Sequence, residues 1–230
     1  MNIDILSVFL NTIKQIWFLI PIAVLVMIIK TPWFKGMMGE LMVNVMSKLF
    51  LPKNTYHRVQ NVTLPTDNNA TQGTTQIDHI IVSRYGVFVV ETKNMKGWIF
   101  GSSNQKTWTQ KIYKHNHKFQ NPLHQNFKHI KTLEYCLGLS ENKLFSLVVF
   151  VGDNTFKTQM PDNVTRGYGY IRYIKLRKEL LLSDYEVTSI LQKIEASRLT
   201  RSFKTNREHV KHVKGIIASK EKASADKTDA

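Results

Sequence analysis

Cysteine is almost absent from the 230 residues, because Cys136 is the single one. One cysteine excludes an internal disulfide and any zinc site built from several thiolates, and it suits a reducing compartment without requiring one. A buried structural thiol and a reactive nucleophile are both readings of Cys136, and the buried thiol is the favoured one.

Acidic residues are scarce as well, with 17 Asp and Glu against 32 Lys and Arg, so the formal net charge is +15. This balance favours a polyanionic partner, either nucleic acid or an anionic membrane face. The sequence contains no P-loop, dinucleotide fingerprint, H-E-x-x-H or G-x-S-x-G pattern, which argues against the enzyme classes that these motifs define.

Long hydrophobic runs are limited to one, the uncharged residues 16–29. A bilayer span needs about 20 residues, and this run reaches that length if it extends back to residue 5 or forward to residue 34. No small-x-small cleavage site follows it, so an uncleaved anchor is favoured over a signal peptide, with a core helix of a soluble protein as the alternative. Lysines are more frequent after the run than before it, which predicts a single-pass membrane protein whose main domain is cytoplasmic.

Helical and strand patterns alternate through the middle of the chain. Apolar spacing predicts helices over residues 39–50, 121–139 and 183–197, the last opening with a capping box of Ser183 and Glu186. Strands are predicted over 56–64, on either side of the turn at 84–86, and over 144–152, with 98–101 and 108–114 continuing the same sheet. This order predicts a mixed α/β or α+β core.

Two details of these elements are open to test. On helix 121–139 the apolar stripe is expected to consist of Leu123, Phe127, Ile130, Leu133 and Leu137. Trp98 and Trp108 are candidates for base stacking, although core or strand-edge packing is the favoured role for both.

Charged residues interrupt the apolar hairpin at Asp78, Glu91 and Lys93. If the loop has two residues and Ser83 pairs with Gly86, then Asp78 lies opposite Glu91 and Lys93 shares their face. A three-residue loop would instead turn Glu91 to the other face. Two adjacent carboxylates repel unless a proton or a cation lies between them, so the first register suggests a hard divalent ion. A surface ion pair of Glu91 and Lys93 is the alternative.

These residues carry a resemblance to a known family. The segments GE, TQIDHIIVSRYGVFVVETKNMKGWIFG, WTQ and NPLHQNFKHI are similar to the nuclease-related domain family, NERD, over about residues 36–150. Asp78 followed by Glu91-Thr92-Lys93 also resembles the PD-(D/E)xK nuclease pattern, with Ile77 where the proline would stand. The resemblance implies a restriction-endonuclease-like fold, a mixed β-sheet flanked by helices, and a nuclease that uses Mg²⁺ or Mn²⁺.

The resemblance also implies roles for individual residues. Asp78 and Glu91 would hold the metal, Glu40 would add a carboxylate from the preceding helix, and Lys93 would orient the attacking water or stabilise the charge on phosphate. Gln110 and Gln125 match polar positions of the family and would contact substrate or metal-bound water, or be surface amides.

The C-terminal part is rich in cations that recur every three or four residues. A helix with this spacing would follow phosphates, lie against anionic lipid, or simply be solvated. The weak nucleic-acid-binding candidates are Arg198, Arg201, Lys204, Arg207, Lys211 and Lys214. The predicted organisation is therefore an N-terminal membrane anchor (1–35), a NERD nuclease-like domain (36–152), a basic, mainly helical extension (153–219) and a disordered tail (220–230).

The expected function is that of a metal-dependent nuclease at the cytoplasmic face of a membrane, with DNA preferred to RNA as partner. Because many proteins of the wider fold are dimers, the resemblance also makes a homodimer an expected arrangement. Two alternatives from other classes stay open. One is a catalytically inactive module that binds nucleic acid or a partner at the membrane, and the other is a structural membrane adaptor.

Overall fold

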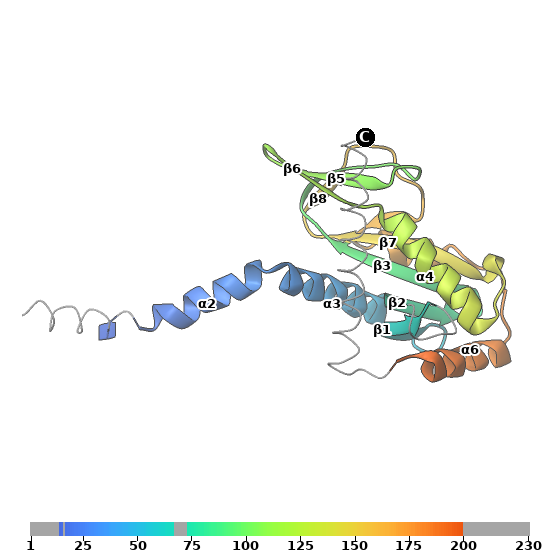
Figure 1. Ribbon diagram of the computed structural model, residues 1–230. Coiled ribbons are helices and arrows are strands. Elements are labelled where there is room, and N and C mark those ends of the chain that lie inside the picture. The colour runs from blue at the N-terminus through green and yellow to red at the C-terminus, as the bar shows by residue number, and fades with distance from the viewer. Residues whose placement is uncertain (1–13, 16, 67–72, 200–230) are drawn as a thin grey trace, which may run out of the picture.

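A mixed five-stranded sheet, sheet A, forms the centre of the computed structural model (Figure 1), which describes residues 14–15, 17–66 and 73–199. Its strands run in the order β1-β2-β3-β7-β9, with β1, β2 and β3 antiparallel and β7 and β9 parallel to their neighbours. The predicted mixed α/β core is confirmed. The strands are β1 (His57–Pro65), β2 (Thr74–Ser83), β3 (Gly86–Asn94), β7 (Leu144–Val151) and β9 (Val164–Arg166).

Helices cover both faces of sheet A. Helices α3 (Pro32–Phe50) and α5 (Gly169–Lys175) bury Val43 and Ile174 against one face. Helices α4 (Pro122–Leu137) and α6 (Asp184–Ser197) cover the other. A 3-10 turn (Glu141–Lys143) leads from α4 into β7. Each sheet face is buried, which explains why β7 is apolar at every position except Ser146.

A second sheet, sheet B, corrects the expectation that residues 98–114 continue the main sheet. Its order is β6-β5-β4-β8, and it packs on β7 and β9 through a cluster that includes Trp108, Phe119 and Phe150. Residues 115–120, for which the sequence predicted no strand, form one of its strands. The strands are β4 (Gly97–Phe100), β5 (Thr107–Ile112), β6 (His115–Gln120) and β8 (Asn154–Phe156).

Helix α4 presents a different face from the expected one. Ile130, Leu133 and Leu137 are buried as predicted, but 55% of Phe127 is exposed. Asn126 is fully buried in its place and donates hydrogen bonds from its side-chain amide to the carbonyl oxygens of Val89 and Leu147. The stripe prediction was wrong at this turn because polar residues, rather than apolar ones, face the sheet there.

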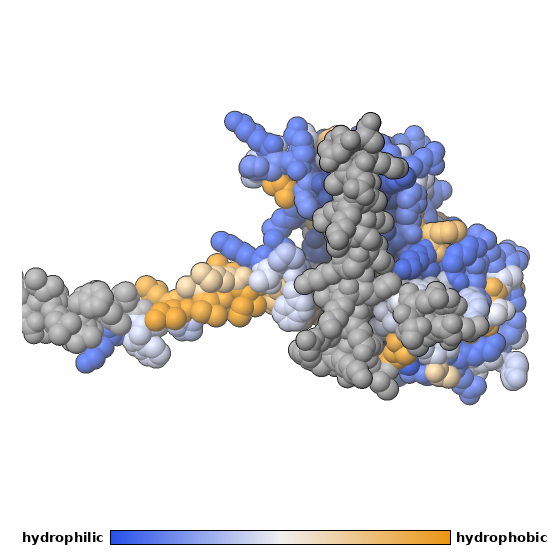
Figure 2. All heavy atoms as spheres, in the orientation of Figure 1, coloured by the Kyte–Doolittle hydropathy of each residue, from blue (hydrophilic) through white to orange (hydrophobic). Residues whose placement is uncertain are grey.

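The N-terminal helices differ from a single straight span. Helix α2 (Leu19–Lys30) has no buried residue. It projects away from the α/β domain, and its exposed surface is largely apolar (Figures 1 and 2). Thr31 alone separates α2 from α3, and its side chain caps α3 by accepting from the Phe34 N–H. Among the described residues no single helix is long and apolar enough to cross a membrane, whereas α2 and α3 satisfy the criterion together as a pair bent by 68°. Residues 1–13 and 16 of the predicted anchor lie outside the described part.

The segment after β7 contributes to both sheets and both helical layers. β8 joins sheet B, β9 joins sheet A, and α6 starts with the predicted capping box of Ser183 and Glu186. Arg198 ends α6 and pairs with Glu195 at 2.8 Å. The remaining cations proposed for nucleic-acid binding and the predicted tail lie outside the described residues; they are Arg201, Lys204, Arg207, Lys211, Lys214 and residues 220–230. The predicted domain boundaries stay predictions.

Cys136 lies partly buried on α4 beside the core. Burial raises the pKa of its thiol, so the nucleophilic thiolate is disfavoured at neutral pH. This environment suits a structural thiol.

Candidate active site

The β2–β3 hairpin has the two-residue loop that brings the charged residues together. Ser83 pairs with Gly86, and the register continues to His79 opposite Val90. Asp78 and Glu91 follow directly after this last pair, and Asp78 is close enough for Glu91 to raise its pKa. The alternative three-residue loop, which would have turned Glu91 away, is excluded.

Strand β2 changes its side-chain alternation at Asp78. Ile80 belongs to the core cluster beneath α4 and α6, and so does Ile77, although residues three apart on a regular strand face opposite ways. Asn61 stands across from this point on β1 and has a φ of 53°, a left-handed conformation that asparagine tolerates. Such irregularities re-aim side chains, and this one lies at the position of the candidate carboxylate.

Glu91 is buried and held from two sides. Lys93 Nζ donates to Glu91 Oε1 at 2.6 Å, and His129 Nε2 lies 3.2 Å from Oε2. Behind the imidazole, the Thr75 hydroxyl lies 2.7 Å from His129 Nδ1. Burial by itself raises the pKa of Glu91, but the hydrogen bonds and charges of His129 and Lys93 outweigh it, so the net pKa is lowered. Glu91 is therefore a carboxylate at neutral pH.

Lys93 links strand β3 to helix α4. Its ammonium donates to Gln125 Oε1 at 2.9 Å as well as to Glu91. Two acceptors fix the position of an otherwise flexible side chain that stays partly exposed. Gln125, considered from the sequence as an accessory residue, thus orients the lysine.

Asp78 has the opposite electrostatic character from Glu91. Its Oδ2 accepts the Thr92 N–H at 2.8 Å, where the pairing of β2 and β3 ends. Burial and the neighbouring carboxylates Glu91 and Glu40 raise the pKa of Asp78 well above its ordinary value, against the smaller opposing effects of Thr92 and Lys93. The negative charge on Asp78 is consequently less stable than that on Glu91, and a cation would relieve it.

Glu40 reaches the group because α3 lies very close to the sheet. A Cβ on Gly39 would come within 2.8 Å of the Asn94 Cβ and 3.2 Å of Val151 Cγ2, so only glycine permits this approach. The Asn94 amide also donates to the Lys35 carbonyl at 2.6 Å. In the Gly39-Glu40 pair, Gly39 therefore allows the close contact with the sheet, and this contact positions Glu40.

Gln110 does not join the carboxylates. Its amide donates to the Lys96 carbonyl at 2.8 Å, and its side chain lines a cleft of about 800 Å³ that Lys93 and Thr92 also line. The cleft runs between the α2–α3 corner and sheet B. The cations on its wall are Lys30, Lys35, Lys93 and Lys96. None of the described residues that line it is an acid, so the cleft suits an anionic ligand.

The donor chemistry of the site fits a hard cation, since Asp78, Glu91 and Glu40 offer carboxylate oxygens and the charge on Asp78 is unfavourable beside the other two. In this conformation both Glu91 oxygens are engaged by Lys93 and His129. Within the described parts of the chain, no three His, Cys, Asp or Glu residues are arranged to hold a metal ion. Metal binding would therefore require Glu91 to exchange one of these partners.

His129 and Asn126 are functional-site neighbours that sequence reasoning missed. Both are buried on α4 and face the strands that carry Glu91 and Lys93. The position of His129, four residues after Gln125 and three after Asn126, was an available signal, because residues one turn apart on a helix share a face. From the sequence, only an apolar stripe was considered on this helix, and the polar residues beside it were overlooked.

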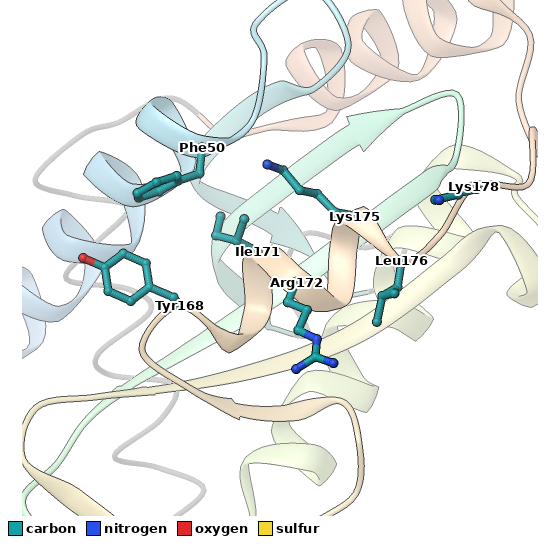
Figure 3. A pocket seen from close by; sticks show the side chains of 7 residues that line it. All are labelled: Phe50, Tyr168, Ile171, Arg172, Lys175, Leu176 and Lys178. Atoms are coloured by element: carbon teal, nitrogen blue, oxygen red, sulfur yellow. The ribbon is translucent and has the colours of Figure 1, made fainter.

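A different hollow, of about 690 Å³, lies between the end of α3 and α5 (Figure 3). Phe50 and Tyr168 meet edge to face at its rim, and Arg172 and Lys175 extend from α5 beside them. It shares no residue with the carboxylate site and carries no acid. The hollow is not part of the candidate active site.

The fold and the site together define a mixed α/β domain in which the end of a strand hairpin carries Asp78, Glu91 and Lys93, with Glu40 on a helix close enough to influence Asp78. The chain belongs to the NERD (nuclease-related domain) family, whose match spans residues 35–151, just over half of the chain. The predicted family is thereby confirmed.

One curated relative with a comparable segment is an uncharacterised protein of Bacillus anthracis. It is 48% identical over 106 residues, which represent 46% of this chain and 48% of the relative. The chain thus spans about half the length of that protein. No solved structure matches.

Proposed function

We propose that the protein is a metal-dependent nuclease that hydrolyses phosphodiester bonds, acting on DNA in preference to RNA. The observation that carries this proposal is the convergence of Asp78, Glu91, Lys93 and Glu40 at the end of the β2–β3 hairpin, in a member of the nuclease-related family. The strongly unfavourable charge on Asp78 supports the binding of a cation beside it.

In this proposal Asp78 and Glu91 hold Mg²⁺ or Mn²⁺, with Glu40 as the third carboxylate. When bound, the metal would polarise a phosphoryl oxygen and lower the pKa of water. Lys93, oriented by Gln125, stabilises the extra negative charge that develops on phosphate. His129 keeps the Glu91 carboxylate in one orientation through its ring, which Thr75 fixes from behind.

The substrate enters through the cleft between the α2–α3 corner and sheet B. Lys30, Lys35 and Lys96 contact its phosphates on the way to Lys93. Phosphate contacts carry no sequence information, so we expect little sequence preference.

The test is cleavage of duplex, single-stranded and branched DNA and RNA by the full-length chain in detergent, with Mg²⁺, Mn²⁺ or EDTA. Asp78→Asn, Glu91→Gln and Lys93→Ala should each lower the rate by at least about 100-fold, while the exposed ion-pair variants Glu141→Gln and Lys131→Ala should cleave normally. Cleavage that persists in Asp78→Asn, or that proceeds fully in EDTA, would refute the assignment.

A catalytically inactive binding module is the second candidate, and one observation favours it. Lys93 and His129 already satisfy Glu91 without a metal, so the site is stable as an ion-pair network. This candidate expects nucleic-acid binding that is equal with and without Mg²⁺ and no turnover on any substrate.

We also propose that α2 anchors the protein in a membrane with the sandwich on the cytoplasmic side. Support comes from the unburied apolar surface of α2 and from the bent pair that it forms with α3. If α2 follows the membrane normal, a 68° bend lays α3 close to the membrane plane. The outward side chains of α3 are apolar and exposed, which suits that position; they include Trp33, Met37, Leu41, Val45 and Leu49.

A further inference from the structure

Sheet B has an outer face that the core does not cover. Ile99 on β4 is fully buried, so its neighbour Trp98 points the opposite way, and 47% of Trp98 is exposed. Lys111 on β5 pairs directly with Trp98 and therefore lies on the same outer face. By the same alternation, this face also carries Thr109, Asn116 and Lys118.

Two ammonium groups flank the exposed indole. Lys157 Nζ lies 4.5 Å and Lys111 Nζ 5.9 Å from the Trp98 ring centroid. They come from different strands or strand ends, one after β8 and the other on β5. Trp98 is thus an open aromatic surface with positive charge on its edges.

Beside Trp98 the outer face continues into a polar hollow of about 630 Å³. Lys106 and Lys118 line it, together with Phe100 and with serine, threonine and glutamine side chains. The hollow therefore offers donors and positive charge next to an aromatic surface.

None of the described strands of sheet B contains an Asp or Glu. Residues 95–120 contain five lysines and no Asp or Glu, and β8 adds no acid; Asp153 precedes that strand. The surface over sheet B is largely hydrophilic in Figure 2. An exposed tryptophan between lysines is typical of a surface on which bases stack, and solvation of the lysines alone does not account for it.

We propose that the outer face of sheet B binds single-stranded nucleic acid. A base stacks on Trp98, Lys111 and Lys157 contact the adjacent phosphates, and the strand continues past Lys106 and Lys118. A duplex keeps its base faces inside the helix, so only an unpaired strand presents one to Trp98. The inference rests on the nucleic-acid substrate of the proposed function.

The connection to the carboxylate site is short. Only Met95 and Lys96 separate β3, which carries Lys93, from β4, which carries Trp98. Gln110, on the inner side of β5, lines the catalytic cleft. A nucleic-acid strand bound to the outer face therefore stays near the cleft, because only the thickness of sheet B separates the two.

The experiment measures fluorescence anisotropy of a labelled oligothymidylate of about 16 nucleotides, and of a duplex of the same length. The full-length chain is used in detergent with EDTA, which excludes metal-dependent cleavage. Trp98→Ala should weaken single-strand binding about five-fold or more, whereas Trp98→Phe should retain most of the affinity. Lys111→Ala/Lys157→Ala should weaken binding and reduce its salt dependence.

Matched controls come from surfaces elsewhere. Tyr185→Ala removes an aromatic that is 83% exposed on α6, and Lys175→Ala/Lys178→Ala removes two charges at the hollow in Figure 3. Both should bind like the wild type. Normal binding by Trp98→Ala, or losses as large in the controls, would overturn the inference, as would equal loss of duplex binding.

Cleavage measurements separate this inference from the proposed function. Trp98-dependent binding without turnover would refute the nuclease and support the binding face. Metal-dependent cleavage with unchanged binding in Trp98→Ala would do the reverse. Equal thermal unfolding of Trp98→Ala and Trp98→Phe shows that a loss of binding is not a loss of fold.

Discussion

At the scale of single residues, the two carboxylates of the site differ in what surrounds them. Glu91 has a lysine and a histidine as partners, and Asp78 has a backbone N–H and two other carboxylates nearby. Pairs whose environments push their pKa values apart are typical of catalytic sites. The same contrast makes predictions about stability that need no activity assay.

Asp78→Asn should stabilise the metal-free protein. An unfolded Asp78 loses its proton near pH 3.8, and the folded one does so at a higher pH, so the folded state binds more protons in between. The contribution of Asp78 to the free energy of unfolding is therefore stabilising at low pH, and it is lost as the pH rises through the pKa of Asp78 in the folded protein. Thermal unfolding in EDTA at pH 7 should show a Tm higher by about 2–4 °C for each kcal/mol of relief.

Two comparisons check this explanation. The Tm difference between Asp78→Asn and wild type should shrink toward pH 3.8, and Mg²⁺ should raise the Tm of the wild type but not of the variant. Asp153→Asn, an exposed acid, serves as control. A lower Tm for Asp78→Asn in EDTA at pH 7 would contradict the assigned charge strain.

His129→Ala should lower the free energy of unfolding by about 1–3 kcal/mol, because Glu91 and Thr75 each lose a buried hydrogen-bond partner. As a positioning residue it should also weaken Mg²⁺ binding by about ten-fold. Urea unfolding and calorimetric titration with Mg²⁺ measure the two effects. His124→Ala, at an exposed position on the same helix, should change neither, and equal effects at both positions would remove the special role of His129.

At the scale of elements, helix α3 depends on one close contact with the sheet. Gly39→Ala should destabilise the protein by about 1–3 kcal/mol, because the new Cβ meets Asn94 and Val151. Gly36→Ala on the same helix meets nothing within 4 Å and should stabilise by up to about 1 kcal/mol through helix propensity. Chemical denaturation of the two variants gives the comparison, and equal responses would exclude the packing explanation.

The hairpin was readable from the sequence, while sheet B was not. Alternation predicted the two strands of the hairpin, because neighbouring strands obey local rules, but it left the register open between a two-residue and a three-residue loop; the structure has the two-residue loop. β8 has three residues and pairs with β4 from more than fifty positions away. No local pattern specifies such a partner, so the strands of sheet B were recognised and assigned to the wrong sheet.

The candidate site shows the same division. Asp78, Glu91 and Lys93 were found because charges stand out inside an apolar hairpin. His129 was not, because a histidine on a helix carries no sign of the strand that it faces. The break in the alternation of β2 near Asp78 depends on Asn61 across the sheet, and it was equally invisible in one dimension.

At the scale of the whole molecule, α2 is an unburied apolar helix beside a strongly basic domain. We expect the full-length chain to float with liposomes that contain anionic lipid. Ile22→Lys/Leu25→Lys should abolish flotation, because each charge in a membrane-buried segment costs about 2.5–3.5 kcal/mol. Leu176→Lys/Leu180→Lys alters two exposed leucines of the domain and should float normally. A wild-type chain that stays in the dense fraction would refute the anchor.

The corner at Thr31 has a consequence for where such an enzyme can work. Glu40 lies nine positions after Thr31 on continuous helix, about 14 Å along the axis, and no flexible linker lies between them. If α2 is embedded in a bilayer, the proposed catalytic centre stays close to the membrane surface. Nucleic acid that crosses or touches the membrane could then reach the site, whereas chromosomal DNA far from the membrane could not.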